Sequence, residues 1–165
     1  MDRQINVRNA REEDAENLLE IYRPYVENTA VSFEYHIPTV VEYSDRIRSV
    51  SDKWLWLVAE ENEKPIGYAY GSSHRPREAY KYPVETTVYV HESNHRRGIA
   101  RLLYTELLAG LADRDYRNAY AGVALPNEAS IKFHQSMRFE FIGVFPLVGN
   151  KFGQWYDVAW LHKSL

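Results

Sequence analysis

A basic loop between a strand and a helix is the stretch of this sequence whose residue types most readily suggest chemistry. β-Branched residues alternate with polar ones over residues 84–90, which predicts a strand, and leucines recur at helical spacing over residues 99–111. Between the two lie Arg96, Arg97 and Gly98. The first turn of a helix has unpaired N–H groups and the positive end of the helix dipole, and glycine lets the backbone come close to a ligand. The pattern favours a phosphate site, although basic loops before helices are also common on ordinary protein surfaces.

Two side chains in and after this stretch could move a proton. Glu85 lies on the predicted strand, and a positioned carboxylate can act as a general base. His134 lies on a later predicted helix, and histidine titrates near neutral pH. Taken alone, a single glutamate on a strand is most often a solvated charge, and a histidine beside Phe133 on an apolar helix face is most often a core residue. From the residues alone, both interpretations stay open.

Composition and motifs exclude several functional classes. The formal net charge of -3 and the pI near 6.1 argue against a general nucleic-acid binder. The sequence contains no cysteine, so it has neither a thiol nucleophile nor a cysteine-based zinc site. Gly98 is not followed by the Lys-Ser/Thr pair of a P-loop. His74, His91 and His95 lack the spacing of metal ligands, so we expect no metal and a surface position for these histidines.

The length and the order of the predicted elements describe one α/β domain. With 165 residues we expect a single domain over residues 1–165. No long apolar stretch near the start suggests a signal peptide or a membrane span, and the lack of cysteine suits the cytoplasmic location that we expect. Periodicity predicts a strand at 5–7, a helix at 12–22 ended or kinked by Pro24, an irregular loop at 28–37, a helix at 40–50, hairpin strands at 54–59 and 65–70, a strand at 118–124, a helix at 130–137, and strands at 139–148 and 151–162 around a Gly149-Asn150 turn. Such an α/β (α+β) domain would have a mixed, mostly antiparallel sheet flanked by helices.

The basic loop resembles the acetyl-CoA pyrophosphate loop of the GCN5-related N-acetyltransferase (GNAT) superfamily. The family pattern is Gln/Arg-x-x-Gly-x-Gly/Ala, and this chain has His95-x-x-Gly98-x-Ala100, which departs at the first position. Because such a loop binds mainly through backbone amides, the departure weakens the motif without removing its mechanism. Further segments look like the phosphinothricin and methionine sulfoximine acetyltransferase branch: Asn28-Thr29, Ser32-Phe33-Glu34, Trp56-Leu57-Val58-Ala59-Glu60, Arg77-x-Ala79-Tyr80, Val84-Glu85-x-Thr87-Val88-Tyr89-Val90, Leu125-Pro126-Asn127, His134 and Gly153-x-Trp155-x-Asp157.

The resemblance implies the GNAT acyl-CoA N-acyltransferase fold, with acetyl-CoA as cosubstrate. In that fold the strands through Val90 and Ala124 splay apart, and acetyl-CoA is expected to lie in the gap between them. The residues implied to bind its pantetheine arm and pyrophosphate are Val88, Tyr89, Val90, Arg96, Arg97, Gly98, Ile99, Ala100 and Arg101. Asn127, which is also typical of a helix N-cap, and Ser136 are implied to contact acetyl-CoA as well.

The resemblance also implies catalytic roles that need no covalent enzyme intermediate. Acetyl transfer from a thioester requires a free amine, a polarised carbonyl and a thiolate that can leave. The family pattern Val-Glu-x-Thr assigns the base to Glu85, and the helix position of His134 implies a role as either acid or base. Backbone N–H groups near Val88 are expected to polarise the thioester carbonyl.

The branch implies a small amino-acid analogue as the amine acceptor, such as phosphinothricin, methionine sulfoximine or methionine sulfone. The residues implied to bind it are Phe33, Glu34, Arg77, Tyr80, Glu85 and Thr87. An arginine fork suits a carboxylate, although Arg77 could equally be a solvated basic residue. A peptide N-terminus or a polyamine as acceptor, and a non-catalytic acetyl-CoA sensor, are the alternatives. The resemblance also implies a homodimer, and neither nucleic acid nor membrane as a partner.

One departure from the family concerns the end of the helix that carries His134. The family usually has a Gly-aromatic pair there, and this chain has Arg138-Phe139. Glycine takes a left-handed helix cap at little cost, whereas arginine pays about 1 kcal/mol for the same conformation. We therefore expect a reshaped helix end.

Overall fold

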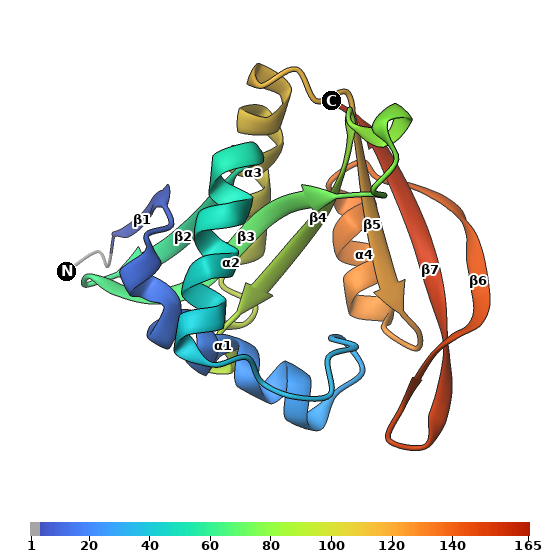
Figure 1. Cartoon of the computed structure of the whole chain (residues 1–165), viewed down its shortest axis with the longest axis horizontal. Helices are drawn as coiled ribbons and strands as arrows, with labels where there is room; N and C mark the ends of the chain where they lie inside the picture. The colour runs from blue at the N-terminus through green and yellow to red at the C-terminus, as the bar shows by residue number, and fades with distance from the viewer. Residues whose placement is uncertain (1–3) are drawn as a thin grey trace.

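The computed structural model describes residues 4–165, which form a seven-stranded sheet with helices packed on it (Figure 1). The strand order is β1-β2-β3-β4-β5-β7-β6, and every neighbouring pair is antiparallel except β4 and β5. The strands are β1 (Ile5–Asn9), β2 (Trp56–Glu61), β3 (Lys64–Ser73), β4 (Pro83–Val90), β5 (Asn118–Ala124), β6 (Glu140–Lys151) and β7 (Gln154–Ser164). The predicted mixed, mostly antiparallel sheet is confirmed.

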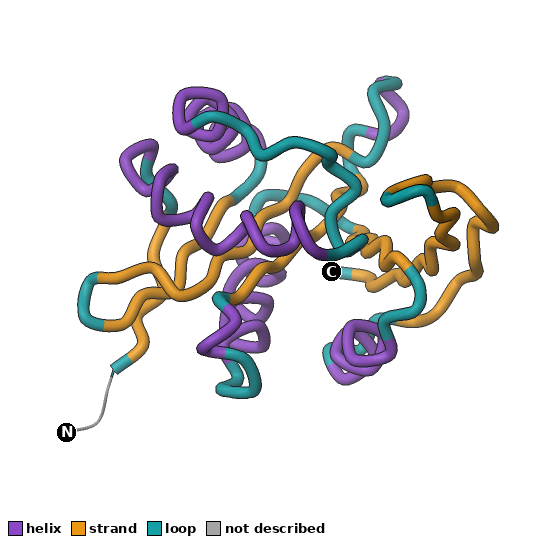
Figure 2. The backbone as a smooth tube through the Cα atoms, turned by 90° about the horizontal axis from the view of Figure 1, so that it is seen from below, coloured by secondary structure: helices purple, strands orange, loops and turns teal. Residues whose placement is uncertain are grey.

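Helices cover both faces of this sheet (Figure 2). The α-helices of the described residues are α1 (Ala15–Asn28), α2 (Val40–Lys53), α3 (Ile99–Asp113) and α4 (Glu128–Ser136), and the short 3-10 turns are η1 (Glu12–Asp14), η2 (Glu78–Tyr80) and η3 (Glu92–Asn94). Strand side chains alternate between two cores: Leu57 of β2 packs with α3, whereas Trp56 and Val58 pack with α1 and α2. The middle of the sheet, which includes β4, is therefore packed from both sides.

Helix α1 continues through Pro24 to Asn28, so this proline does not end the helix. A proline in a helix interior costs about 3 kcal/mol. Tyr22 and Val26, on either side of it, are both buried, and burying two such side chains stabilises by roughly the same amount. The burial of this helix in the core therefore offsets the local cost of the proline.

The turn between β6 and β7 lies at Phe152-Gly153, so the predicted turn at Gly149-Asn150 is wrong. Both turn residues have positive φ, 54° and 70°. Gly149 instead lies within β6 opposite Tyr156, and the ring of Phe33 occupies the space that a side chain at Gly149 would need. The glycine is explained by the close approach of a distant loop, which a local pattern cannot reveal.

Arg138 takes the left-handed conformation at the end of α4, with φ 66°, so the predicted reshaping of this helix end is wrong. The Arg138 N–H donates to the Gln135 carbonyl at 2.9 Å, and the Phe139 N–H donates to the His134 carbonyl at 3.0 Å. This pair of bonds is the Schellman motif that glycine usually permits. Phe139 is buried, and its packing holds Arg138 in the less favourable conformation.

Candidate active site

Strands β4 and β5 pair at one end and diverge at the other, as Figure 1 shows, and the gap between them is the centre of the site. In the described chain, the register between them covers only Pro83, Val84 and Glu85 with residues 118–120. Beyond this short ladder the gap holds a cavity of about 160 Å³, here called the gap cavity. It is lined by β4, β5 and α4, including Val88, Tyr89, Val123, Asn127, Ser130 and His134. The sheet therefore opens where the resemblance implies that it should.

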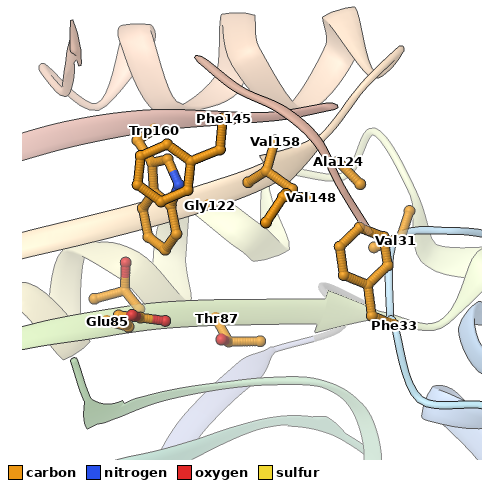
Figure 3. A pocket seen from close by; sticks show the side chains of 11 residues that line it. Val31, Phe33, Glu85, Thr87, Gly122, Ala124, Phe145, Val148, Val158 and Trp160 are labelled. Atoms are coloured by element: carbon orange, nitrogen blue, oxygen red, sulfur yellow. The ribbon is translucent and has the colours of Figure 1, made fainter. Parts of the chain in front are cut away.

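A larger cavity of about 380 Å³, here called the apolar cavity, adjoins the gap cavity (Figure 3). Its apolar walls come from the loop after α1 and from β6 and β7: Val31, Phe33, Phe145, Val148, Val158 and Trp160. Glu85 and Thr87 face these walls from β4. Both cavities are lined by Val31, Thr86, Thr87, Gly122 and Ala124. The two cavities are adjoining parts of one cleft.

Glu85 brings a carboxylate to the apolar cavity, and its side chain is 32% exposed. Burial raises the pKa of this carboxyl, while a hydrogen bond from His74 and the nearby charge of Arg75 act in the opposite direction. A half-buried carboxylate with a raised pKa, facing a small-molecule cavity, is well suited to take a proton from an amine.

His74 was expected on the surface, and that expectation is wrong. Its side chain is 17% exposed, and its Nδ1 lies 2.9 Å from Glu85 Oε1. The ring stacks on Tyr120 with centroids 5.1 Å apart. His74 directly follows β3, and the antiparallel register Ser73↔Val84 brings it next to Glu85. A prediction that the strand before His74 pairs with the strand of Glu85 could have located this histidine at the site.

His134 lines the gap cavity from α4 and is 5% exposed. Its Nδ1 lies 2.8 Å from the Ser130 carbonyl, which can only accept, so we assign a proton to Nδ1. Its Nε2 lies 3.1 Å from the Tyr104 hydroxyl, which in turn lies 3.1 Å from Thr86 Oγ1. Burial lowers the pKa of His134, so the ring is mostly neutral at pH 7. A chain of polar groups therefore links His134 to β4, and the sequence did not indicate the part of Tyr104.

The loop before α3 exposes backbone where a helix begins. Arg96 and Gly98 have φ 62° and 77°, and Gly98 is the N-cap residue of α3. Apart from chain neighbours, no atom lies within 4 Å of a methyl group placed on Gly98, so the glycine is required by the backbone conformation and not by packing. Ile99, Ala100 and Arg101 form the first turn, whose N–H groups have no partner within the helix. This geometry fits a pyrophosphate.

His95, which departs from the family pattern, joins this loop to the rest of the fold. Its Nε2 lies 3.0 Å from the Val90 carbonyl and 2.9 Å from the Tyr25 hydroxyl. Tyr25 also donates to the Val90 carbonyl at 2.6 Å. The histidine thus connects the loop to the end of β4 and to α1, a role that does not depend on contact with a phosphate.

Two of the three arginines at the loop, Arg97 and Arg101, have partners within the protein. Arg97 pairs with Glu61 at 2.6 Å, so its guanidinium is engaged at the end of β2, whereas Arg96 is exposed. Arg101 donates to Ser136 Oγ at 2.8 Å, which brings these two predicted acetyl-CoA ligands together between α3 and α4. Asn127 caps α4 by accepting from the Ser130 N–H at 3.2 Å, and it also lines the gap cavity.

The predicted acceptor residues divide into two groups. Phe33, Thr87 and Glu85 line the apolar cavity. Glu34 pairs with Arg46, while Arg77 and Tyr80 are exposed at η2, and none of these three lines that cavity. The Tyr80 ring nevertheless lies 5.6 Å from the His74 ring. Their binding of an acceptor stays a prediction.

Among the described residues, 4–165, no group of three or more His, Asp or Glu side chains is arranged to hold a metal ion. None of the helices in this part of the chain has both the length and the apolar character needed to cross a membrane.

The fold and the cleft define an acyl-CoA N-acyltransferase architecture, and comparison with known proteins gives the family. The model of the acetyltransferase (GNAT) domain matches residues 7–160, so this chain belongs to the GNAT acetyltransferases. A phosphinothricin N-acetyltransferase of Streptomyces coelicolor is 37% identical, over 98% of this chain and 97% of the relative.

Two more distant relatives extend the comparison. An L-methionine sulfoximine/L-methionine sulfone acetyltransferase of Salmonella typhimurium is 29% identical, over 98% of this chain and 95% of the relative. The crystal structure of a GNAT superfamily phosphinothricin acetyltransferase from Sinorhizobium meliloti, in complex with acetyl-CoA, superposes with a TM-score of 0.93 at 30% identity, over 98% of this chain and 88% of that one. The predicted superfamily, fold and branch are confirmed.

Proposed function

We propose that this acetyltransferase moves the acetyl group of acetyl-CoA to the amino group of a small amino-acid analogue of the phosphinothricin, methionine sulfoximine or methionine sulfone type. The observation that carries the proposal is Glu85, a carboxylate with a raised pKa in an apolar cavity that adjoins the gap between β4 and β5. The volume of about 380 Å³ lies in the range of small-molecule sites. The acceptors named for the relatives support the same class.

Acetyl-CoA supplies an activated acetyl group, and the residues of the cleft bind it and move protons. We assign its pantetheine arm to Val88, Tyr89 and Val90, and its pyrophosphate to the N–H groups of the loop and first helical turn at residues 96–101. Arg101, Asn127 and Ser136 complete this side. The backbone of β4 that has no β5 partner can donate to the thioester carbonyl, where fixed donors stabilise developing negative charge.

Glu85 provides the chemistry on the acceptor side. It takes a proton from the ammonium group of the acceptor, so that the free amine attacks the thioester carbonyl. A C–N bond forms as the C–S bond breaks, and coenzyme A leaves as a thiolate. The second proton that leaves the nitrogen is transferred to this thiolate. His134, linked to Tyr104, lies in the gap cavity as the group that can give or take this proton. We place the acceptor among Phe33, Glu34, Arg77, Tyr80 and Thr87, with Arg77 on its carboxylate.

The test is thiol release from acetyl-CoA with phosphinothricin, methionine sulfoximine, methionine sulfone and a polyamine, together with mass analysis of the product. Turnover on the amino-acid analogues, with the acetyl group on the α-nitrogen, is the expected result. Turnover on the polyamine alone would overturn the acceptor class. Tight binding of acetyl-CoA without turnover on any amine would overturn the enzymatic role.

The assembly and location follow from separate arguments. Strand β6 lies at the edge of the sheet and exposes apolar side chains, among them Phe141, Ile142, Val144 and Leu147. We therefore propose that residues 1–165 act as one acetyltransferase domain in a homodimer that covers β6. Light scattering is expected to give a dimer that Ile142→Glu converts to a monomer. A monomeric wild type would contradict the proposed homodimer.

Because cytoplasmic metabolism supplies acetyl-CoA, we place the protein in the cytoplasm.

A further inference from the structure

We propose that His74 is a positioning residue for Glu85: it holds Oε1, and this leaves Oε2 as the oxygen that receives the proton of the acceptor amine. The inference rests on the proposed role of Glu85 as the base. The contact between His74 Nδ1 and Glu85 Oε1, at 2.9 Å, is its starting point. Because a carboxylate only accepts, a neutral His74 must carry its proton on Nδ1 to make this bond.

Aromatic rings from three other elements fix the plane of the His74 ring. Tyr120 of β5 stacks on it with centroids 5.1 Å apart and an interplanar angle of 22°. The Trp160 ring of β7 meets its edge at 6.2 Å and 85°, and the Tyr80 ring of η2 at 5.6 Å and 68°. With its side chain only 17% exposed, His74 has little freedom to turn away. The imidazole is therefore a preset donor and not a flexible surface group.

The same rings connect the donor to the wall of the apolar cavity. Trp160 lines that cavity, and its ring also packs against Gly122, where an added methyl group would lie only 3.1 to 3.3 Å from the ring. Trp160, a wall of the cavity proposed for the acceptor, and His74, the donor to Glu85, thus belong to one packed cluster. A general base must lie within hydrogen-bond reach of the proton that it removes, so a fixed orientation of Glu85 serves the reaction directly.

Charge supports the same assignment. Burial raises the pKa of Glu85, whereas the hydrogen bond from His74 and the nearby charge of Arg75 lower it. The titratable groups around His74 are Glu85, Arg75, Tyr80 and Tyr120, and the His162 ring packs against Tyr120 with centroids 5.0 Å apart. If the His74 donor is removed, burial still raises the pKa of Glu85, but the hydrogen bond that lowers this pKa is lost. Its pKa then rises, and less of the carboxylate form is present at a given pH.

The experiment compares three substitutions by acetyl-CoA thiol release with L-methionine sulfone across pH. His74→Asn keeps an amide donor near the position of Nδ1, while His74→Phe keeps a ring without a donor and His74→Gln places its donor further out. We expect His74→Phe and His74→Gln to lower kcat about 10-fold, a part of the 10²- to 10⁴-fold contribution typical of a general base, and His74→Asn to stay within about 3-fold. The acidic limb of the pH profile is expected to move to higher pH in His74→Phe and not in His74→Asn.

A double variant of His74 and Glu85 distinguishes a positioning role of His74 from a general structural role. In a Glu85→Gln background, His74→Phe is expected to change kcat by less than about 2-fold, because residues that act as a unit are not additive. Wild-type kcat in His74→Phe and His74→Gln, or a full additive loss in the double variant, would overturn the inference. If His74→Phe does not fold, the Asn and Gln pair decides: equal activity in both overturns it. Full turnover in Glu85→Gln alone would instead overturn the base assignment, and the His74 role with it.

Discussion

The two parts of the cleft are built in different ways. The gap cavity is made mostly from one continuous part of the chain, from β4 through Tyr104 of α3 and β5 to α4, and β4 runs along it beyond its short ladder with β5. The apolar cavity is assembled from side chains of the loop after α1, β4, β5, β6 and β7. The gap cavity can therefore bind one cosubstrate, acetyl-CoA, through backbone groups, with few requirements for particular side chains. The apolar cavity depends on which side chains distant segments bring together, so we expect acceptor choice to reside there.

Lys151 fixes the loop after α1, which forms one wall of the apolar cavity. Its Nζ, buried where β6 meets the end of α1, donates to the carbonyls of Val26, Thr29 and Ser32 at 2.7, 2.7 and 2.6 Å. Burial lowers the pKa of this lysine, which nevertheless is held by acceptors that stabilise its charged form. It thereby anchors the loop whose Phe33 forms a wall of the apolar cavity.

Among the predicted substitutions that distinguish the apolar cavity from the gap cavity, Lys151→Met should have the largest effect. We expect a loss of about 3 kcal/mol in unfolding free energy, because three carbonyls lose a charged donor. The acceptor KM should rise about 10-fold while the acetyl-CoA Kd stays within about 3-fold, since the loop supports only one part of the cleft. Urea unfolding and two-substrate kinetics check this. Lys132→Met, at a side chain 72% exposed, is the matched control, and an equal rise in the acetyl-CoA Kd would break the comparison.

The contact between Phe33 and Gly149 offers a second test of the acceptor side. A methyl group at Gly149 would overlap the Phe33 ring, so Gly149→Ala should cost about 2 kcal/mol and raise the acceptor KM. In a Phe33→Ala background the same change should cost nearly nothing, as measured by a double-mutant cycle of unfolding free energies. Gly143→Ala, where a methyl group would meet no atom within 4 Å, is the control. Equal costs in both backgrounds would disprove the contact.

On the gap side, His134 should make stability depend on pH. Its pKa in the folded protein is lowered from the ordinary value of about 6.5, so between these values the unfolded chain binds more protons than the folded one. Stability from this residue is therefore complete above that window and falls as the pH falls through it, by at most about 1.4 kcal/mol per pH unit. Urea unfolding of His134→Gln at pH 7.5 and 5.5 should show a smaller decrease than wild type. An identical decrease would mean that His134 titrates normally.

The smallest expected effect lies at the end of α4. Arg138→Gly should raise the unfolding free energy by about 0.5 to 1 kcal/mol, because glycine takes the observed φ of 66° without steric cost but loses more entropy on folding. Thermal unfolding measures the gain. Arg114→Gly, at a C-cap residue with φ -95°, should give none. A stability loss in Arg138→Gly would show that the arginine side chain contributes more than its backbone costs.

The sequence predicted what local pattern controls. The alternation along residues 84–90 and the helical spacing after Gly98 placed β4, the loop and α3, and Glu85 and His134 indeed line adjoining cavities. It did not predict His74, whose position depends on the β3–β4 register, or Lys151, whose bonds span 119 to 125 residues of chain. The Gly149 error has the same origin, because the reason for that glycine is a ring from a distant loop. Periodicity therefore predicts the helices and strands, but it does not predict contacts between residues that are far apart in the sequence.

The most direct test of Glu85 as the base is kcat/KM for L-methionine sulfone in wild type and Glu85→Gln. Thiol release measures it, under conditions in which both proteins are fully folded. If Glu85 takes the amine proton, kcat/KM should fall by about 10²- to 10⁴-fold while acetyl-CoA still binds with its wild-type Kd. A Glu85→Gln enzyme that retains kcat/KM within about 10-fold would contradict the role of Glu85 as the base, because another group or the solvent would then be removing the proton.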